Sequence, residues 1–143
     1  MTCENDSRYC SCLYYSAGAL ARAMTKMAEE EFSITQLAPS YAFLLMTVNY
    51  KPGIQPKEIS RIMMLTPSTV TRLIEKMEFK GFLQRKSTGK FTEVFPKQKS
   101  LDMNDKIQLA WSNLLDRYTS ILGKAESKQL TEDIYTAVIN LQK

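Results

Sequence analysis

The sequence predicts a mostly α-helical protein with one small β-hairpin, and three observations support this fold class. Apolar residues recur at helical spacing over most of the 143 residues. The stretch 82–96 is instead rich in β-forming residues on both sides of Gly89. Hydrophobic residues make up 44% of the chain and charged residues 24%, which is the range of ordinary folded domains. We therefore expect a single domain with its own core.

Residue content narrows the chemistry that this domain can perform. The chain has no histidine, which excludes serine–histidine and cysteine–histidine hydrolase mechanisms. Its three cysteines cannot complete a four-ligand zinc site. The sequence has no glycine-rich phosphate loop and no paired-carboxylate motif. We therefore expect no catalytic residues, no metal and no cofactor, and a protein that is not an enzyme.

The start of the chain and its hydropathy predict a location. No run of about 18 apolar residues is present, and residues 1–12 are polar, unlike a signal peptide. We expect a cytoplasmic protein with no membrane partner.

Positive charge is concentrated in the middle of the chain. The net charge is +4 overall, but residues 51–100 carry +7, whereas residues 1–50 carry −2 and residues 101–143 carry −1. A basic block of this kind fits a polyanionic partner. A solvated, lysine-rich surface would produce the same pattern.

Helical periodicity begins near the amino terminus. A first helix is predicted from about 10 to 30. Ser40 is predicted to cap a second helix, and Pro56 to open a short third helix. The residues expected to face the core in the second and third helices are Tyr41, Leu44, Leu45, Val48, Ile59, Ile62 and Met63.

The next predicted helix has an unusual outer face. Thr66 and Pro67 have the sequence of a helix start, and Gly81 is a typical residue just past a helix end. Its outward residues are small, hydroxylated or charged, namely Ser68, Thr69, Thr71, Arg72, Glu75 and Lys76. Small residues let a helix approach base edges closely, and an arginine can bind guanine O6 and N7 together. Two short helices joined in this way form a helix-turn-helix pattern.

A basic hairpin follows this helix directly. Two short β-rich segments flank residues 87–90, and Pro96 ends the second. We place Arg85, Lys86 and Lys90 at or near the hairpin tip, where phosphate or minor-groove contacts are made. A helix-turn-helix followed by such a hairpin is a winged helix-turn-helix.

Two further helices are predicted after residue 100, separated by Gly123. Their apolar faces have the spacing of ordinary core residues. However, these two helices and the first helix together carry more apolar surface than a small winged unit needs for its own core. Pairing of two subunits would bury this additional apolar surface in an interface.

The stretch from Gln55 to Arg85 resembles the winged helix-turn-helix of the MarR family of transcriptional regulators, and the order of elements agrees over nearly the whole chain. The resemblance implies one MarR-like domain over 1–143, with the winged unit at about 40–97 and dimerisation helices at about 10–30 and 100–141. It implies a homodimer that binds double-stranded DNA at a pseudopalindromic operator and is released by a small ligand or an oxidant.

The resemblance also assigns DNA-contacting residues. It implies base and phosphate contacts on the recognition helix by Ser68, Thr69, Thr71 and Arg72, and a contact by Arg85 at the start of the wing. The full predicted set is Ser68, Thr69, Thr71, Arg72, Lys76, Arg85, Lys86 and Lys90. The chain departs from the family in its wing, which is short and lacks the usual Asp-x-Arg motif. Lys90 is the candidate to replace the wing arginine.

Two signals are compatible with this family. Cys10 and Cys12 lie among tyrosines, as does the reactive cysteine of the organic-hydroperoxide-sensing branch, but they could equally be incidental thiols. A small aromatic or amphipathic ligand is the other signal. Its predicted contacts, which could equally be core residues, are Tyr14, Tyr41, Met46 and Trp111.

The sequence therefore favours a DNA-binding regulator of the MarR type that responds to a ligand. A thiol-based redox regulator of the same family is one alternative. The other is a winged-helix module that binds protein rather than DNA, which would leave the face from Ser68 to Arg72 without a role.

Overall fold

The computed structural model describes residues 7–143 and is mostly helical with one β-hairpin, as the sequence predicts. In chain order the elements are α1 (Leu13–Phe32), the short 3-10 helix η1 (Ser33–Thr35), α2 (Pro39–Tyr50), α3 (Pro56–Met63), α4 (Pro67–Phe79), β1 (Leu83–Thr88), β2 (Phe91–Pro96), α5 (Gln98–Leu122) and α6 (Lys124–Leu141). Among these helices, none combines the length and the apolar character needed to cross a membrane.

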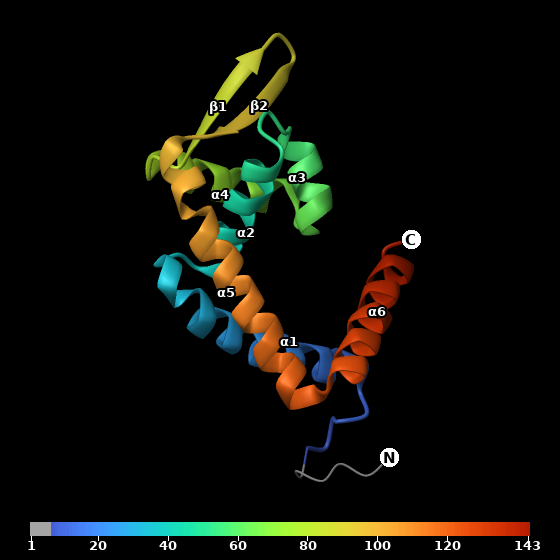
Figure 1. The fold of residues 1–143 in the computed structure, drawn as a ribbon. Helices are drawn as coiled ribbons and strands as arrows, with labels where there is room; N and C mark the ends of the chain where they lie inside the picture. The colour runs from blue at the N-terminus through green and yellow to red at the C-terminus, as the bar shows by residue number, and fades with distance from the viewer. Residues whose placement is uncertain (1–6) are drawn as a thin grey trace.

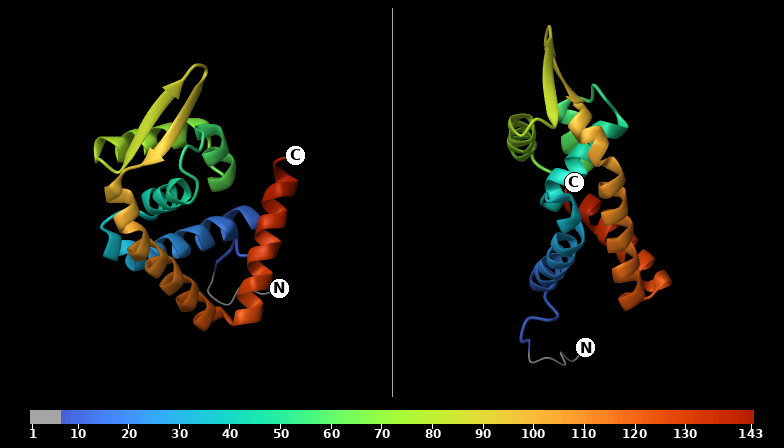
Figure 2. Two further views of the ribbon diagram at one scale, coloured as in Figure 1. Left: turned by 45° about the horizontal axis from the view of Figure 1, so that its top comes forward. Right: turned by 60° about the vertical axis from the view of Figure 1, so that its left-hand side comes forward.

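The elements form two parts. The winged unit consists of α2, α3, α4 and the hairpin, and the helices α1, α5 and α6 form the arms. In Figure 1 the hairpin lies at the top, above α2, α3 and α4. The long helix α5 descends from the hairpin, and α6 turns back from its lower end, so that the two helices diverge as the arms of a V (Figures 1 and 2). Helix α1 packs against α5 and α2. The arms therefore connect directly to the winged unit through α5.

One hydrophobic core joins the winged unit to α5. Val48 of α2, Ile74 of α4 and Ile107 of α5 are all buried within it. The largest fully buried side chains are Phe32, Leu44, Leu45, Ile54, Ile59, Ile74, Met77, Leu83 and Ile107. Ile62 was predicted to face this core, but it is 48% exposed, because α3 is only 8 residues long and turns a single narrow face inward.

The predicted ends of several helices are confirmed. Thr66 caps α4, and its side chain accepts a hydrogen bond from the backbone N–H of Thr69. Gly81 follows the end of α4 with φ +82, and Gly123 separates α5 from α6 with φ +98. Both glycines adopt a left-handed backbone conformation that disfavours other residues.

Two predicted helix starts are wrong. Ala38, and not Ser40, is the N-cap of α2, because Pro39 occupies the first helical position, where its fixed φ suits the helix. Helix α1 begins at Leu13 rather than near Cys10, since the backbone N–H of Cys12 bonds to the carbonyl of Tyr9 in a preceding turn.

The hairpin is regular and closely tied to the winged unit. Its register pairs Leu83 with Pro96 and Thr88 with Phe91, leaving a two-residue turn at Gly89 and Lys90. Gly89 has φ +64, as the first position of a type II′ turn requires. At the hairpin base, the Val94 N–H donates to the Ile54 carbonyl at 2.9 Å, so the loop between α2 and α3 pairs with β2.

Candidate nucleic-acid interface

The first turn of α4 is organised by hydroxyl groups. The Thr66 Oγ1 lies 2.9 Å from the Thr69 Oγ1 and 3.3 Å from the Ser68 Oγ. The Thr71 hydroxyl donates to the Pro67 carbonyl at 3.0 Å, which leaves its oxygen lone pairs free to accept. This end of α4 therefore presents small side chains that can both donate and accept hydrogen bonds.

The predicted recognition residues lie together on the exposed side of α4. Ser68, Thr71, Arg72 and Lys76 are exposed, and Thr69 is half-buried beneath them. The opposite side of the helix, which includes Val70, Ile74 and Met77, is buried in the core. The core thus fixes which face of α4 points outward.

Arg72 lies along the helix toward its first turn. Its Nη2 donates to the Thr69 Oγ1 at 3.5 Å, at the long limit of a hydrogen bond. Such a contact orients the guanidinium without engaging most of its donors. Five N–H groups in a planar fork suit a bidentate acceptor such as a guanine edge.

Arg85 lies near the start of the wing, as the resemblance implies, and not at or near the hairpin tip, where we placed it from its position beside Lys86. It is the third residue of β1, and its guanidinium points to α4, where Nε and Nη2 donate to the Glu78 Oε1 at 3.1 and 2.9 Å. The Arg85 backbone N–H donates to the other Glu78 oxygen at 2.9 Å. Glu75 adds a more distant carboxylate at 3.9 Å. Arg85 therefore links the wing to the recognition helix.

Lys86 and Lys90 occupy the outer part of the hairpin. Lys90 is exposed in the turn itself, which confirms its predicted position. The Lys86 Nζ lies over the Phe95 ring, 4.9 Å from its centroid, in a cation–π contact. Both ammonium groups are therefore on the exposed part of the hairpin, beyond the contact between Arg85 and Glu78.

The interaction between Glu78 and Arg85 changes the acidity of Glu78. The backbone N–H of Arg85, and then its guanidinium, hold the pKa of the Glu78 carboxyl below its usual value. Because the folded state holds this proton less tightly, the ionised carboxylate stabilises the fold above the unfolded pKa. That contribution is lost as the pH falls through the lowered folded pKa.

We expect Glu78→Gln to lower the free energy of unfolding at neutral pH by about 1 kcal/mol or less, since the pair is partly exposed. The difference from wild type should shrink at acid pH, where Glu78 is protonated in both states. Urea unfolding over a pH series measures this effect, with Glu132→Gln, at an exposed position on α6, as the matched control. An equal loss at every pH would mean that the charge of Glu78 contributes nothing.

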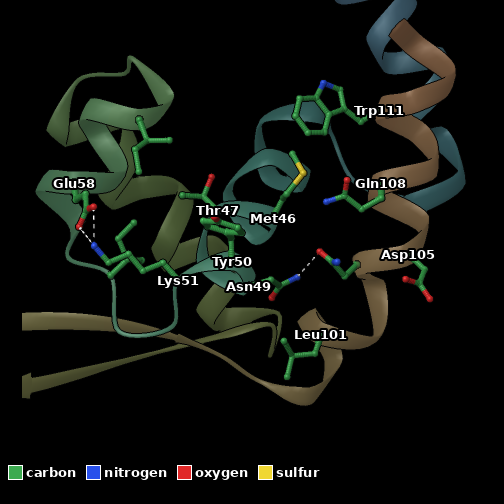
Figure 3. Close-up of a pocket in the computed structure, with 13 residues that line it drawn as sticks. Met46, Thr47, Asn49, Tyr50, Lys51, Glu58, Leu101, Asp105, Gln108 and Trp111 are labelled. Carbon is green, nitrogen blue, oxygen red and sulfur yellow. Dashed lines mark hydrogen bonds and ion pairs between the residues drawn. The ribbon is translucent and has the colours of Figure 1, made fainter. Parts of the chain in front are cut away.

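A cavity of about 880 Å³ opens between α2, α3 and α5 (Figure 3). Its apolar wall includes Met46, Ile62, Leu101 and Trp111. Trp111 is half-exposed, and its ring meets that of Phe43 edge to face at 5.8 Å. The cavity lies where the winged unit meets the long arm α5.

A partly buried polar network lies at the edge of this cavity. The Ser100 hydroxyl donates to the Asn49 Oδ1 at 2.7 Å, and the Asn49 Nδ2 donates to the Ser100 carbonyl at 3.1 Å. The same amide nitrogen donates to the Asn104 Oδ1 at 3.2 Å. Ser100 is fully buried, so these bonds satisfy groups that water cannot reach. They connect the end of α2 to the start of α5.

The four predicted ligand residues are not all brought together. Met46 and Trp111 line the cavity, whereas Tyr14 and Tyr41 do not. Tyr14 is 80% exposed on α1, where it contacts the Tyr15 ring, and Tyr41 is half-buried against the core.

The two cysteines singled out in the sequence differ in state. Cys12 is exposed with a free thiol and is the N-cap residue of α1. Cys10 is half-buried and disulfide-bonded. Because α1 begins at Leu13, Cys10 lies outside this helix.

Sequence reasoning missed Glu78 and Asn49. The spacing of Glu75 and Glu78 along one helix face indicates a site for a cation, but only the fold brings Arg85 across the turn at Gly81 to meet it. Asn49 at the end of an apolar helix was a polar residue without an assigned role. Its partners lie about 50 residues further along the chain, with sequence separations of 51 and 55.

The fold and this site define a class. A short helix pair, an outward face of hydroxyls and arginine on the second helix, and a basic hairpin bound to that helix make the central part of the chain a winged helix-turn-helix. Helices before and after it form the arms.

Comparison with known proteins bears on the resemblance to the MarR family in the central part of the chain. Residues 37–88 match the MarR family model. The resemblance to this family is thereby confirmed over the stretch that carries the helix-turn-helix. The chain is 27% identical over 85 residues to the uncharacterised HTH-type transcriptional regulator YybA of Bacillus subtilis (strain 168). That match covers 57% of this chain and 57% of YybA, so it spans little more than half of either protein.

Solved structures match over nearly the full length. The PcaV transcriptional regulator from Streptomyces coelicolor, in complex with its natural ligand, has a TM-score of 0.81 at 15% identity, and the match covers 100% of both chains. The MepR–DNA complex from S. aureus has a TM-score of 0.78 at 14% identity, covering 90% of this chain and 97% of MepR. The arms as well as the winged unit therefore have the fold of MarR-type regulators.

Proposed function

We propose that the chain is a non-enzymatic, cytoplasmic transcriptional regulator that binds double-stranded DNA as a homodimer. In this proposal each subunit inserts α4 into one of two successive major grooves of a pseudopalindromic operator. A small aromatic or amphipathic molecule, bound between the winged unit and α5, releases the protein from DNA.

The observation that carries the DNA-binding proposal is the exposed face of α4. Its first turns present the hydroxyls of Ser68 and Thr71 and the guanidinium of Arg72, with no large side chain to keep the helix away from base edges. Lys86 and Lys90 extend the same basic surface onto the hairpin, where phosphates would be contacted. The DNA complex of the structurally similar MepR supports this use of the fold.

The surface of the single chain supports a homodimer. It exposes 10255 Å², whereas a compact monomer of 16.4 kDa exposes about 7,500 Å². Large apolar side chains are exposed on α1, α5 and α6. Among them are Leu13, Leu115, Ile121, Leu130, Ile134 and Leu141. An interface over these faces would remove them from water.

The position of the cavity supports release by a ligand. The cavity is lined by α2 and α3 of the winged unit and by α5, so a bound molecule would contact both parts at once. A ligand that fits one relative placement of these parts better than another shifts the population toward it. PcaV, which has this fold, was solved with its natural ligand.

Selection of DNA fragments from the source genome by the purified protein tests the proposal. We expect enrichment of sites with two-fold symmetry and half-sites about one helical turn apart. Affinity should fall steeply with salt, because each neutralised phosphate makes the slope of log K against log salt more negative by about 0.9. Failure to enrich any sequence, together with salt-insensitive capture of a protein partner, would favour the protein-interaction alternative.

Redox sensing by a cysteine remains a second hypothesis, since Cys12 is exposed with a free thiol at the start of α1. The thiolate is the form that peroxide oxidises, and an exposed thiol is accessible to the oxidant. Oxidation there would alter the surface that we assign to the dimer interface.

We expect organic hydroperoxide to release the operator complex of wild type and of the Cys10→Ser, Cys12→Ser variant to the same small extent. This result would follow if the signal is a ligand in the cavity. Titration of the two preformed complexes, followed by a gel-shift assay, measures it. Release of wild type alone would establish the redox switch instead.

A further inference from the structure

The cavity between α2, α3 and α5 contains no cation that is free to bind an acidic ligand. Lys51 is the one basic residue among its lining side chains, and Nζ donates to both Glu58 oxygens at 2.8 and 3.0 Å. Arg61 lies 3.7 Å from the same carboxylate. An acidic ligand would have to displace the Glu58 carboxylate from Lys51. The displaced Glu58 would still lie nearby and would repel the negative charge of the ligand. The cavity therefore disfavours acids.

The remaining charge in the cavity lining is negative. Asp105 lies on α5, one turn before Gln108, at the edge of the cavity in Figure 3. Within residues 7–143 its carboxylate forms no ion pair. A positively charged group entering here would gain a partner without breaking an existing one.

The walls of the cavity suit an aromatic or aliphatic body more than a highly polar one. Met46, Ile62 and Trp111 supply apolar surface, and an indole face also attracts cations. Two of the polar side chains that line the cavity already form hydrogen bonds within the protein. The Thr47 hydroxyl donates to the Phe43 carbonyl at 2.7 Å, and the Asn49 amide is held by Ser100 and Asn104.

We propose that this cavity binds an aromatic organic cation, with its ring against Trp111 and Met46 and its positive group toward Asp105. This inference rests on the ligand-responsive part of the proposed function and names the chemical class of the ligand. It excludes aromatic carboxylates as preferred ligands, because Glu58 occupies the cation that they would need.

Three matched probes test the charge preference. They are 4-tert-butylbenzylammonium, 4-tert-butylbenzamide and 4-tert-butylbenzoate, which share one apolar body. Calorimetric titration of the full-length protein without DNA should give affinities that decrease in that order. We expect about a fivefold difference between successive probes, the size of a single charge interaction near solvent. Trp111 is the chain's one tryptophan, so a change in intrinsic fluorescence would place the probe in the cavity.

Two substitutions test the residues that we hold responsible. Asp105→Asn should remove the advantage of the ammonium over the amide. Glu58→Gln should leave Lys51 unpaired and raise the affinity for the benzoate several-fold. Asp102→Asn, one turn earlier at a position outside the cavity lining, is the matched control and should leave all three affinities unchanged.

The proposal is overturned if wild type binds the benzoate as tightly as the ammonium, if Asp105→Asn keeps the preference, or if no probe binds. Because binding is measured without DNA, these outcomes are independent of the operator experiment. Loss of DNA binding with retained preference for the ammonium would contradict the proposed function and leave this inference standing.

Discussion

Replacement of Arg72 by alanine is expected to weaken binding to the selected operator by about 1–3 kcal/mol, or about 5- to 150-fold in Kd. Arg72 is exposed on α4 and oriented by Thr69, and its guanidinium has donors to spare for a base edge. If it reads a base, the loss should be confined to operators that carry that base. A binding assay with operators varied at each half-site position would therefore show relaxed preference at one position.

The control for this prediction lies on the hairpin. Lys86→Ala with Lys90→Ala should weaken binding to all sequences alike and reduce the dependence of affinity on salt, because these residues are placed to contact phosphates. If Arg72→Ala also weakens every operator equally, Arg72 is a phosphate contact and does not read the sequence.

The substitution Ile134→Glu on α6 is expected to separate the proposed dimer and to abolish operator binding in the same concentration range. Ile134 is 42% exposed in the single chain and lies on the same helix face as Leu130 and Leu141. A carboxylate introduced there would be buried in the interface without a partner, at a cost of several kcal/mol. Multi-angle light scattering at micromolar concentration reports the mass, and a gel shift reports DNA binding.

Thr136→Glu provides a matched control on the same helix. Position 136 lies about 160° around the helix from position 134, so the same charge should remain in water. This variant is expected to stay dimeric and to bind DNA. A monomeric wild-type protein of 16.4 kDa, or a dimeric Ile134→Glu variant, would show that α6 does not form the interface.

Local signals in the sequence were sufficient to predict most elements. Helical spacing of apolar residues predicted α4 and α5, and the sequence Thr66-Pro67 predicted the cap that the structure has. These signals act over a few residues, so no tertiary knowledge is needed to read them. The error at Ser40 is also local. A proline at the first helical position decides between two adjacent capping candidates, and here Pro39 makes Ala38 the cap.

The site was less predictable, because it depends on contacts between distant segments. The residue type of Arg85 indicates a DNA contact, but its position beside Glu78 follows from how β1 returns over α4 after Gly81. Tyr14 resembles a ligand residue in sequence, yet it lies on an exposed part of α1, outside the cavity. Residue type and periodicity alone cannot distinguish such outcomes.

The length of α5 has a mechanical consequence. The helix has 25 residues, so it extends for about 37 Å. It begins directly after the hairpin, where the Lys97 N–H donates to the Phe82 carbonyl at 2.8 Å, and it ends at Gly123. A rotation of about 5° at the Gly123 end would displace the hairpin end by about 3 Å, close to the rise of one base pair of about 3.4 Å. A rotation too small to disturb the packing near Gly123 would therefore shift the hairpin by about one base pair relative to the DNA.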